Sequence, residues 1–421
     1  MTTLPNGWIK VQLGNFADIQ LGKMLDKAKN IGQPRAYLRN VNVRWFGFDL
    51  SDLNQMLATE DDSEFFSIKD GDVLICEGGE PGRAAVWNLG DQGLIYQKAL
   101  HRVRTMPVLL PSLLTQQLRL DSFSSRLEKH FSGSTIKHFP AIALNRYEVM
   151  VPPAPEQTRI ADKLDTVLAR VDACRDRLAR VAPLLKRFRQ SVLAAATSGG
   201  LTSEFASKVG SGAWENAPLS KLCERVSVGH VGTTSKYYTS ESQGIQFIRS
   251  QNVRPGRVSW DGLAYITPAF HAALKKSQLK AGDLLVVRVG ANRGDSCMVP
   301  MDHIGELNCA NIVFARPLQE RVHPKFLSIY FQSPACRVRL LNSTVGGVPG
   351  VINTSIVGAI EVSYPSPHEQ TEIVRRVESL FAFADRLEVR LTQARTAADR
   401  LTPALLAKAF RGELVPQDPE D

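Results

Sequence analysis

The chain has 421 residues, enough for roughly two to four domains, and its 43% hydrophobic and 22% charged content excludes a disordered or fibrous protein. Its start lacks the features of a signal peptide and no run of about 18 apolar residues exists, so we expect a cytoplasmic protein without a membrane span. The net charge of +9 favours a polyanionic partner, although a solvated surface excess of charge would give the same balance.

Residues 1–153 are expected to form a first, mostly-β domain. Its strands are rich in β-branched and aromatic residues, and a segment with helical periodicity follows a proline. We expect strands at 36–43, 72–77, 83–87 and 94–105, and a helix at 111–131. About 150 residues are enough for the domain to have a core of its own.

Residues 154–200 predict a long helix. Prolines in VMVPPAPEQTRI (149–160) stop the preceding strand, apolar residues then recur in alternating steps of four and three, and Gly199 is suited to end the helix. A 4-3 stripe of this length predicts a coiled-coil seam. Its positions are Ile160, Leu164, Val167, Val171, Cys174, Leu178, Val181, Leu185, Phe188 and Val192.

The whole pattern recurs about 213 positions later. A linker at 201–213, rich in Gly and Ser, leads to a second mostly-β domain at 214–366, with a late helix expected at 323–342. The segment VSYPSPHEQTEI (362–373) then opens a second long helix in the region 367–415, and a tail at 416–421 follows. The second seam consists of Ile373, Val377, Leu380, Ala384, Leu387, Leu391, Ala394, Ala398, Leu401 and Leu405.

An amphipathic helix of this length is unstable alone in water, so the two helices are expected to pair. The residues allow parallel or antiparallel pairing, and antiparallel pairing would give a pseudo-two-fold arrangement. We therefore expect an α+β protein in which two similar mostly-β domains are separated by two long antiparallel coiled-coil helices. Cys174 lies in the first seam, and we expect a small buried hydrophobic residue there.

The motifs of catalysis are missing from the sequence. It contains no Asn/Asp-Pro-Pro-Tyr/Phe tetrapeptide of amino-methyltransferases, no G-x-x-x-x-G-K-[ST] loop, and no cysteine or histidine spacing for zinc. Gly78-Gly79-Glu80-Pro81-Gly82 is interpreted as a plain turn, because no clear helix follows it. We expect no catalytic, cofactor or metal site in this chain.

DNA contacts are expected from Lys and Arg at phosphates and from Arg, Asn, Gln and His at base edges. Arg39 and Arg249 are the strongest pair because they occupy the same repeat position, although each could equally be a structural arginine that ties its strand to a neighbour. The candidates of the first domain are Arg35, Arg39, Asn40, Asn42, Arg44, Arg83, Lys98, His101, Arg102, Lys137 and His138. Those of the second domain are Arg249, Gln251, Asn252, Arg254, Arg257, Arg288, Asn292, Arg293, Asn311 and Asn353.

The first long helix is markedly basic. Residues 159–190 contain nine Lys/Arg against four Asp, whereas 372–403 contain six Arg against five acids. Such charge is usually a solvated face. We add the hypothesis that part of the first helix, with Arg175 and Arg177, faces phosphate or an acidic partner.

The proline and Glu-Gln motifs that open both helices resemble those of type I restriction–modification specificity (S) subunits, and KLDTVLARVD (163–172) with LAKAFRGEL (406–414) resembles the type IA branch. The resemblance implies that 1–153 and 214–366 are target recognition domains, and that 154–200 and 367–415 are the central and C-terminal conserved helical regions. Each recognition domain would read one half of a split, asymmetric double-stranded DNA site.

The same resemblance implies that the helical regions dock two methyltransferase (M) subunits, through which restriction (R) subunits join. S-adenosylmethionine, ATP and Mg would then serve those partners, with no cofactor in this chain. Three alternatives stay open: a standalone sequence-specific DNA-binding or scaffold protein, the specificity subunit of a fused restriction–methylation enzyme, and an enzyme with an unrecognised site.

Overall fold

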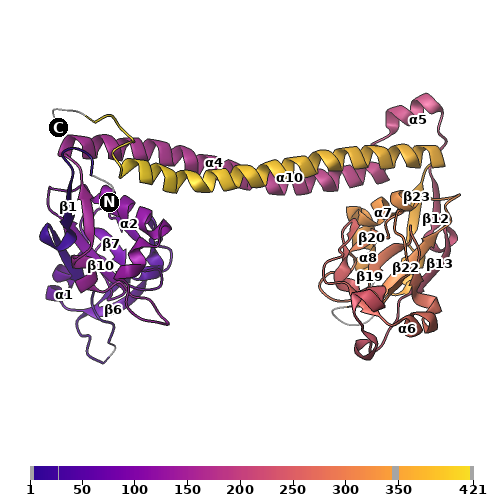
Figure 1. The fold of residues 1–421 in the computed structure, drawn as a ribbon, viewed down its shortest axis with the longest axis horizontal. Coiled ribbons are helices and arrows are strands. Elements are labelled where there is room, and N and C mark those ends of the chain that lie inside the picture. The colour runs from indigo at the N-terminus through magenta and orange to yellow at the C-terminus, as the bar shows by residue number, and fades with distance from the viewer. Residues whose placement is uncertain (1–3, 27, 344–349, 418–421) are drawn as a thin grey trace. The chain divides into compact units, whose positions relative to one another are not determined.

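The computed structural model describes residues 4–26, 28–343 and 350–417. It divides into two compact units: unit 1 comprises Met1–Ala179 and Gln393–Asp421, and unit 2 comprises Arg180–Thr392. Each unit holds one globular domain and parts of two long helices, α4 (Ala154–Thr197) and α10 (Pro367–Ala409) (Figure 1). Residues 418–421 of the expected tail lie outside the described residues, as do 344–349 of the second domain.

The domain of unit 1 is built on antiparallel strands. Its main sheet has the order β2 (Ala17–Leu21), β10 (Leu100–Thr105), β7 (Val73–Cys76), β8 (Ala84–Val86). A smaller mixed sheet has the order β6 (Asn54–Ala58), β3 (Gln33–Leu38), β9 (Ile95–Tyr96), and the hairpin β4 (Val43–Arg44) and β5 (Gly47–Phe48) stands apart. Next to the long helices, β1 (Ile9–Gln12) pairs with β11 (Glu148–Val151).

The domain of unit 2 repeats this plan. Its main sheet has the order β13 (Cys223–Val228), β22 (Ile312–Pro317), β19 (Leu284–Val287), β20 (Ser296–Met298). The second sheet has the order β17 (Ala264–Ile266), β14 (Ile245–Ile248), β21 (Leu307–Cys309), β18 (Gln278–Leu279). The hairpin β15 (Val253–Arg254) and β16 (Arg257–Val258) and the pair β12 (Glu215–Pro218) and β23 (Glu361–Tyr364) complete the repeat.

The late helix of each domain is shorter than the sequence predicted. In unit 1, α2 (Pro111–Phe123) ends early, and a 3-10 turn at Arg126–His130 follows Ser125, whose φ is 54°. In unit 2, the helix expected at 323–342 is two helices, α7 (Pro324–Gln332) and α8 (Pro334–Asn342). The break arises because proline disfavours a helical residue before it, and Ser333 caps α8 by accepting from the Cys336 amide.

Each unit contains further short helices. Unit 1 contains α1 (Glu60–Phe65) and α3 (Ala141–Asn145), and unit 2 contains α6 (Pro268–Ala273) and α9 (Thr354–Gly358). The segment expected to be an exposed linker contains α5 (Ser203–Val209), and Thr202 before it is buried. In the part of the chain that the structure describes, none of the helices has the length and apolarity to cross a membrane.

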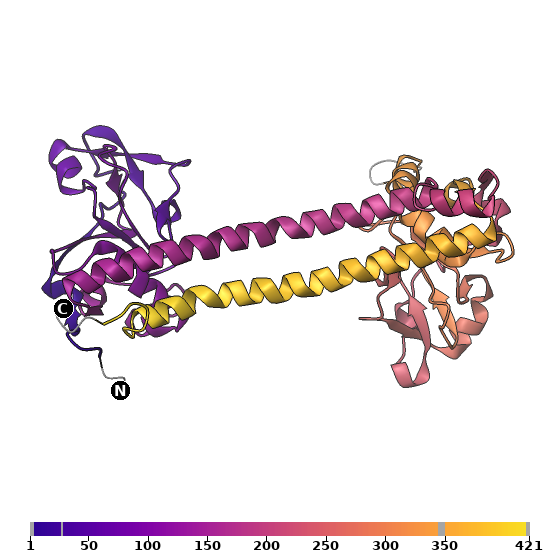
Figure 2. The same ribbon diagram turned by 90° about the horizontal axis from the view of Figure 1, so that it is seen from above.

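The long helices run antiparallel in both units, as predicted (Figures 1 and 2). In unit 1, Arg175 donates to the carbonyl of Ala398 at 3.1 Å and Arg395 donates to the carbonyl of Leu178 at 3.1 Å. In unit 2, Arg189 lies 2.5 Å from Asp385. Residue numbers therefore rise along α4 as they fall along α10. Both helices continue through their internal prolines, Pro183 and Pro403.

The apolar stripe of α4 and α10 is buried or half-buried at all of its predicted positions except two. Ile160, Leu164, Val171 and Leu185 of α4 are buried, as are Ile373, Val377, Ala384, Leu391 and Ala398 of α10. Val167, Leu178, Leu380 and Leu387 are half-buried. Within each unit the ends of both helices join the domain core, with Ile160, Leu164 and Leu406 in one and Val192, Leu193 and Ile373 in the other.

Two predicted seam positions are wrong. Cys174 is exposed, and Leu401 is 45% exposed while the adjacent Thr402 is buried. A straight helix has 3.6 residues per turn, so a strict seven-residue repeat drifts by about 20° per heptad. Leu401 is four heptads beyond Ile373, so the accumulated drift of about 80° carries it off the buried face and brings Thr402 onto it.

Candidate nucleic-acid interface

A buried glutamate at the start of each long helix fastens the helix to its domain. In unit 1, the indole of Trp8 donates to Glu156 at 2.8 Å, and Gln417 donates to the other carboxylate oxygen at 2.5 Å. In unit 2, the indole of Trp214 and the hydroxyl of Thr202 donate to Glu369 at 3.3 and 2.7 Å. The repeated Glu of the Glu-Gln motif therefore accepts from the tryptophan that immediately precedes the first strand of each domain, β1 or β12.

The glutamine that follows makes the same three bonds in each unit. Gln157 accepts from the Leu110 amide and donates to the carbonyls of Val108 and Pro152. Gln370 accepts from the His323 amide and donates to the carbonyls of Arg321 and Pro365. Both glutamines are buried, so these side chains hold the segment before α2 or α7 against the long helix. This arrangement positions each domain on its own helix.

The candidate loops of unit 1 converge at one place. Asn40 donates to the carbonyl of Gly78 at 3.2 Å, and Arg83 donates to the carbonyl of Asn40 at 2.8 Å. A side chain at Gly78 would lie 3.3 Å from the imidazole of His138. The loops after β3, after β7 and before α3, far apart in the sequence, therefore form one contiguous surface.

The equivalent loops of unit 2 are joined in the same way. The Ile352 amide donates to the carbonyl of Arg288 at 3.0 Å, as the Phe139 amide donates to that of Glu77 in unit 1. Arg293 donates to the carbonyl of Gly350 at 2.5 Å, and Ser250 donates to that of Asn311 at 3.1 Å. The repeat therefore preserves the loop framework while the side chains on it differ.

Arg39 and Arg249 have matching structural contacts. The guanidinium of Arg39 donates to the carbonyl and carboxylate of Asp52 at 2.9 and 2.8 Å. That of Arg249 donates to the carbonyl of Gly262 at 3.0 Å, which is also thirteen residues further along the chain. The observed geometry favours the alternative in which these arginines hold a loop.

Four further candidates are corrected because their side chains are buried and already bonded. Asn42 and Asn252 cap the turn that follows β3 or β14 and donate to carbonyls of the next loop. His101 lies 2.8 Å from the carbonyl of Phe139, and Arg102 donates to the carbonyls of Phe65 and Ser67. A side chain without exposed surface cannot meet a base edge. Burial also lowers the pKa of His101.

The other candidates remain accessible to different degrees. The exposed basic candidates are Arg35, Arg44, Lys98, Lys137, His138 and Arg257. Of these, Arg44 lies 3.3 Å from Asp49 and Lys137 lies 3.3 Å from Glu128. The half-buried candidates include Arg83, Arg254, Arg288, Arg293 and Asn353, and Asn353 caps α9 through the Ile356 amide at 2.9 Å. Gln251 and Asn311 are exposed, and Asn292 is half-buried.

Of the two basic-helix candidates, one is engaged within unit 1. Arg175 bonds Asp172 at 3.1 Å and lies 3.5 Å from Asp399, in addition to its bond with the Ala398 carbonyl. Arg177 is exposed. Arg175 therefore helps to pair the helices, and Arg177 is the side chain available to a partner.

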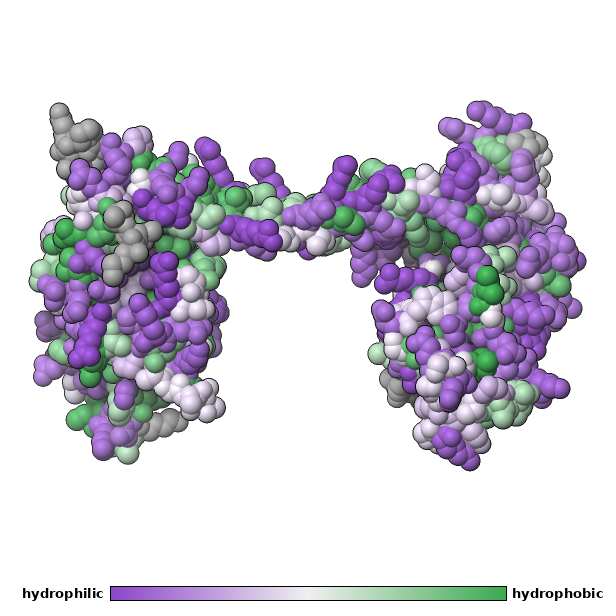
Figure 3. All heavy atoms as spheres, viewed as in Figure 1, coloured by the Kyte–Doolittle hydropathy of each residue, from purple (hydrophilic) through white to green (hydrophobic). Residues whose placement is uncertain are grey.

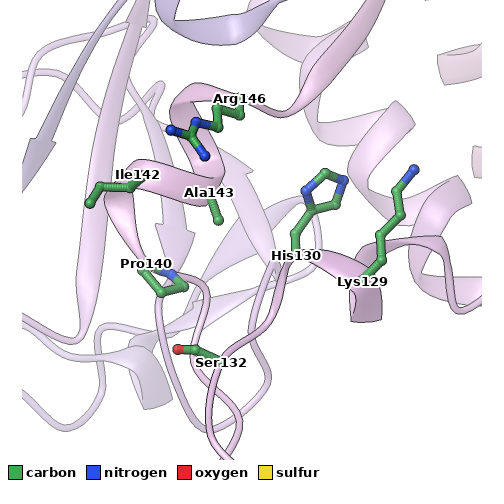
Figure 4. A pocket seen from close by; sticks show the side chains of 7 residues that line it. All are labelled: Lys129, His130, Ser132, Pro140, Ile142, Ala143 and Arg146. Carbon is green, nitrogen blue, oxygen red and sulfur yellow. The ribbon is translucent and has the colours of Figure 1, made fainter.

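A shallow hollow of about 390 Å³ in unit 1 adds residues that the sequence did not single out (Figure 4). It is lined by Lys129, His130, Ser132, Pro140, Ile142, Ala143 and Arg146. Burial and the neighbouring Lys129 lower the pKa of His130, so the cations at the hollow are Lys129 and Arg146. The hollow forms where the 3-10 turn at Arg126–His130 and α3 meet in the fold.

On the faces shown in Figure 3, hydrophilic side chains surround small, scattered apolar patches in both units. Among the described residues, no group of three or more His, Cys, Asp or Glu side chains is placed to hold a metal ion. The acidic run Glu60-Asp61-Asp62 forms the first turn of α1, capped by Thr59, where carboxylates stabilise the helix.

Comparison with known proteins gives consistent relatives. Residues 5–181 match the type I restriction modification DNA specificity domain. The chain is 35% identical over 311 residues to the EcoBI specificity subunit of Escherichia coli, covering 71% of this chain and 65% of that subunit. It is 27% identical over a 438-residue alignment to the EcoKI specificity subunit of Escherichia coli K12, covering 98% and 90%.

Solved structures share the fold. A chain from a study of complex assembly and conformational transition of the type I R-M system has a TM-score of 0.75 at 19% identity, covering 98% of this chain and 99% of that one. The HsdS subunit of Thermoanaerobacter tengcongensis has a TM-score of 0.63 at 19% identity, covering 97% and 98%. Because the sequence matches and the repeated domain–helix plan agree, the chain belongs to the family of type I restriction–modification DNA specificity subunits.

Proposed function

We propose that this chain is the non-catalytic specificity subunit of a type I restriction–modification complex. Each of its two domains reads one half of an asymmetric, bipartite double-stranded DNA site. The proposal also assigns to α4 and α10 the docking of two methyltransferase subunits, through which restriction subunits join. S-adenosylmethionine, ATP and Mg belong to those partners in this scheme.

The observation that carries the proposal is the repetition of one framework with two different sets of side chains. The Trp–Glu and Gln bonds are the same in both units, and so are the loop-joining backbone bonds. The loops themselves differ: Lys98 in unit 1 corresponds to Asn311 in unit 2, where both amides make the same backbone bond. Two copies of a reader with different contact residues suit a site whose halves differ in sequence.

The charge balance supports a DNA partner. The chain carries a net charge of +9, and exposed cations occur on the converging loops of unit 1. Phosphate contacts from such cations orient a protein on the duplex, while base contacts from the loops supply specificity. Binding should therefore weaken steeply with salt.

The test is methylome sequencing of cells that express the chain with its cognate methyltransferase subunit. We expect adenine methylation at a split motif that disappears when the chain is omitted. Exchange of residues 214–365 for those of a relative should change one half of the motif and leave the other half unchanged. Exchange of 1–153 is the matched control and should change only the opposite half.

Two results would contradict the proposal. A change in both halves after either exchange would mean that the domains do not read independently. Tight, sequence-specific binding by the purified chain, together with an absence of methylation in the presence of the methyltransferase subunit, would favour a standalone DNA-binding protein.

A further inference from the structure

Phe46 stands at the tip of the β4–β5 hairpin in a backbone conformation that side chains rarely adopt. Its φ is 64°, and the hairpin closes around it through the pairing of Arg44 with Gly47. The equivalent tip in unit 2 is closed by Arg254 and Arg257, and there the matching residue is Gly256, with a φ of 79°. The turn thus has the geometry that favours glycine, and unit 1 has a phenylalanine in its place.

The ring of Phe46 does not serve the core. The side chain is 43% exposed and belongs to none of the buried apolar clusters of unit 1. An exposed aromatic ring on an unfavourable backbone conformation adds little to stability. Residues of this kind concentrate where a protein binds something, which makes the strain informative about function.

Contacts with Glu80, Ala84 and Arg119 hold the hairpin tip in place. The indole of Trp45 donates to Glu80 at 2.8 Å, and the Phe46 amide donates to the carbonyl of Ala84 at 3.1 Å. The guanidinium of Arg119 lies 4.6 Å from the ring of Trp45 and 4.3 Å from that of Phe123. Phe46 is therefore presented on a braced support.

The equivalent hairpin of unit 2 has the same backbone conformation, but glycine leaves its tip without a side chain. The helices α2 and α7 begin at Pro111 and Pro324, so the counterpart of Arg119 is Gln332. A side chain at Gly256 would approach the amide oxygen of Gln332 to 2.6 Å. The hairpin tip is thus a position where the two units share a frame and differ in what they present.

The tip is continuous with the converging loops of unit 1. Glu80, which binds Trp45, also pairs with Arg83 at 2.7 Å, and Arg83 bonds the carbonyl of Asn40. The surface around the hairpin carries three guanidinium groups: Arg44 pairs with Asp49, Arg83 pairs with Glu80, and Arg119 lies over the ring of Trp45, the neighbour of Phe46. An exposed apolar ring on a hairpin that also carries and contacts guanidinium groups suits a groove of DNA, in which phosphates border the base edges.

We propose that Phe46 contacts the methyl group of a thymine in the major groove of the half-site read by unit 1. The inference rests on the proposed DNA-reading function. A ring without donor or acceptor atoms cannot read the polar pattern of a base edge, and the thymine methyl is the apolar group that the major groove offers. Phe46 is then a specificity-determining residue that the second unit lacks.

The test uses the complex of the full chain with its methyltransferase subunit and duplexes that carry the methylated motif. Each thymine of the first half-site is replaced in turn by deoxyuridine, which lacks only the methyl group, and affinity is measured by fluorescence anisotropy. We expect one replacement to weaken the unaltered complex about threefold to fivefold. The Phe46→Gly complex should bind the thymine duplex more weakly by a similar factor and be insensitive to that replacement.

Matched variants separate contact from folding. Phe46→Gly removes the backbone strain, so its thermal midpoint should not fall, and Phe46→Asn, which also tolerates positive φ, should repeat its binding behaviour. Phe65→Ala is the control, because Phe65 is 55% exposed on the acidic helix α1 and should leave both affinity and uridine sensitivity unchanged.

The outcomes are distinct for the two proposals. If the complex of the unaltered chain binds none of the duplexes more tightly than random DNA, the proposed function is refuted. Specific binding with the same uridine sensitivity in the unaltered and Phe46→Gly complexes overturns only the Phe46 contact. A first half-site without thymine on either strand, or an equal loss on specific and random duplexes, also overturns the contact.

Discussion

Trp8 and Glu156, 148 positions apart, are joined by a buried hydrogen bond of 2.8 Å from the indole nitrogen to the carboxylate. The bond fixes the first strand of the first domain to the start of α4. Its counterpart, between Trp214 and Glu369, measures 3.3 Å. The domains are thus attached to the long helices by specific polar contacts at the corner where strand and helix meet.

Replacement of Trp8 by phenylalanine should destabilise unit 1. It leaves a buried carboxylate with one donor fewer, which costs about 1–3 kcal/mol and lowers the thermal midpoint by about 3–9 °C. The matched variant Trp214→Phe should lose less, because its bond is longer, while one other donor to the glutamate remains in each unit, Gln417 or Thr202. Scanning calorimetry measures both midpoints. Equal losses would show that ring volume, and not the hydrogen bond, sets the cost.

Gln157→Leu and Gln370→Leu should destabilise the protein to the same extent. Each removes three hydrogen bonds to buried backbone groups, and we expect losses of about 2–5 kcal/mol in urea unfolding monitored for each unit by hydrogen exchange. The loss should appear in unit 1 for Gln157→Leu and in unit 2 for Gln370→Leu. If either variant left the stability of the unit that carries it unchanged, the two glutamines would not share the same structural role.

Leu391→Ala and Leu401→Ala compare two leucines of α10 that the heptad pattern treats alike. Leu391 is 8% exposed and Leu401 is 45% exposed. We expect Leu391→Ala to cost about 2–4 kcal/mol and Leu401→Ala to cost less than about 1 kcal/mol in chemical unfolding. Similar costs at the two positions would favour the strict seven-residue seam over the observed packing.

Acid should destabilise unit 1 through His101. Burial lowers the pKa of this imidazole from its ordinary value of 6.5, so the unfolded chain takes up the proton first as the pH falls. Stability from the neutral imidazole is complete above pH 6.5 and is lost below it, by about 1.4 kcal/mol per pH unit until the folded-state pKa is reached.

His101→Gln should therefore flatten the fall of the thermal midpoint between about pH 7.5 and 5.5. His138→Gln, at an exposed histidine, is the control and should leave the slope as it is. Identical slopes in the unaltered chain and in His101→Gln would contradict the buried neutral imidazole.

The sequence by itself determined the plan of the molecule. Features that depend on neighbours along the chain were readable: the apolar stripe from Ile160, its copy from Ile373, the prolines that separate strand from helix, and the glycines that end the helices. Gly199 and Gly412 have φ of 80° and 69°, as helix ends require. The repeat of 213 positions then gave two domains and two helices, because the same local pattern folds in the same way twice.

Only the tertiary structure decided which polar side chains are free. Asn42, Asn252, His101 and Arg102 have the residue types of DNA contacts, and they are buried because loops distant in sequence supply their partners. The exposure of Leu401 follows from the angular drift of the helix summed over four heptads. The exposure of Phe46 follows from a turn with positive φ, which the amino-acid composition does not predict. Burial and partner choice are sums over contacts between segments that meet only on folding, whereas helix periodicity and turn preference are properties of adjacent residues.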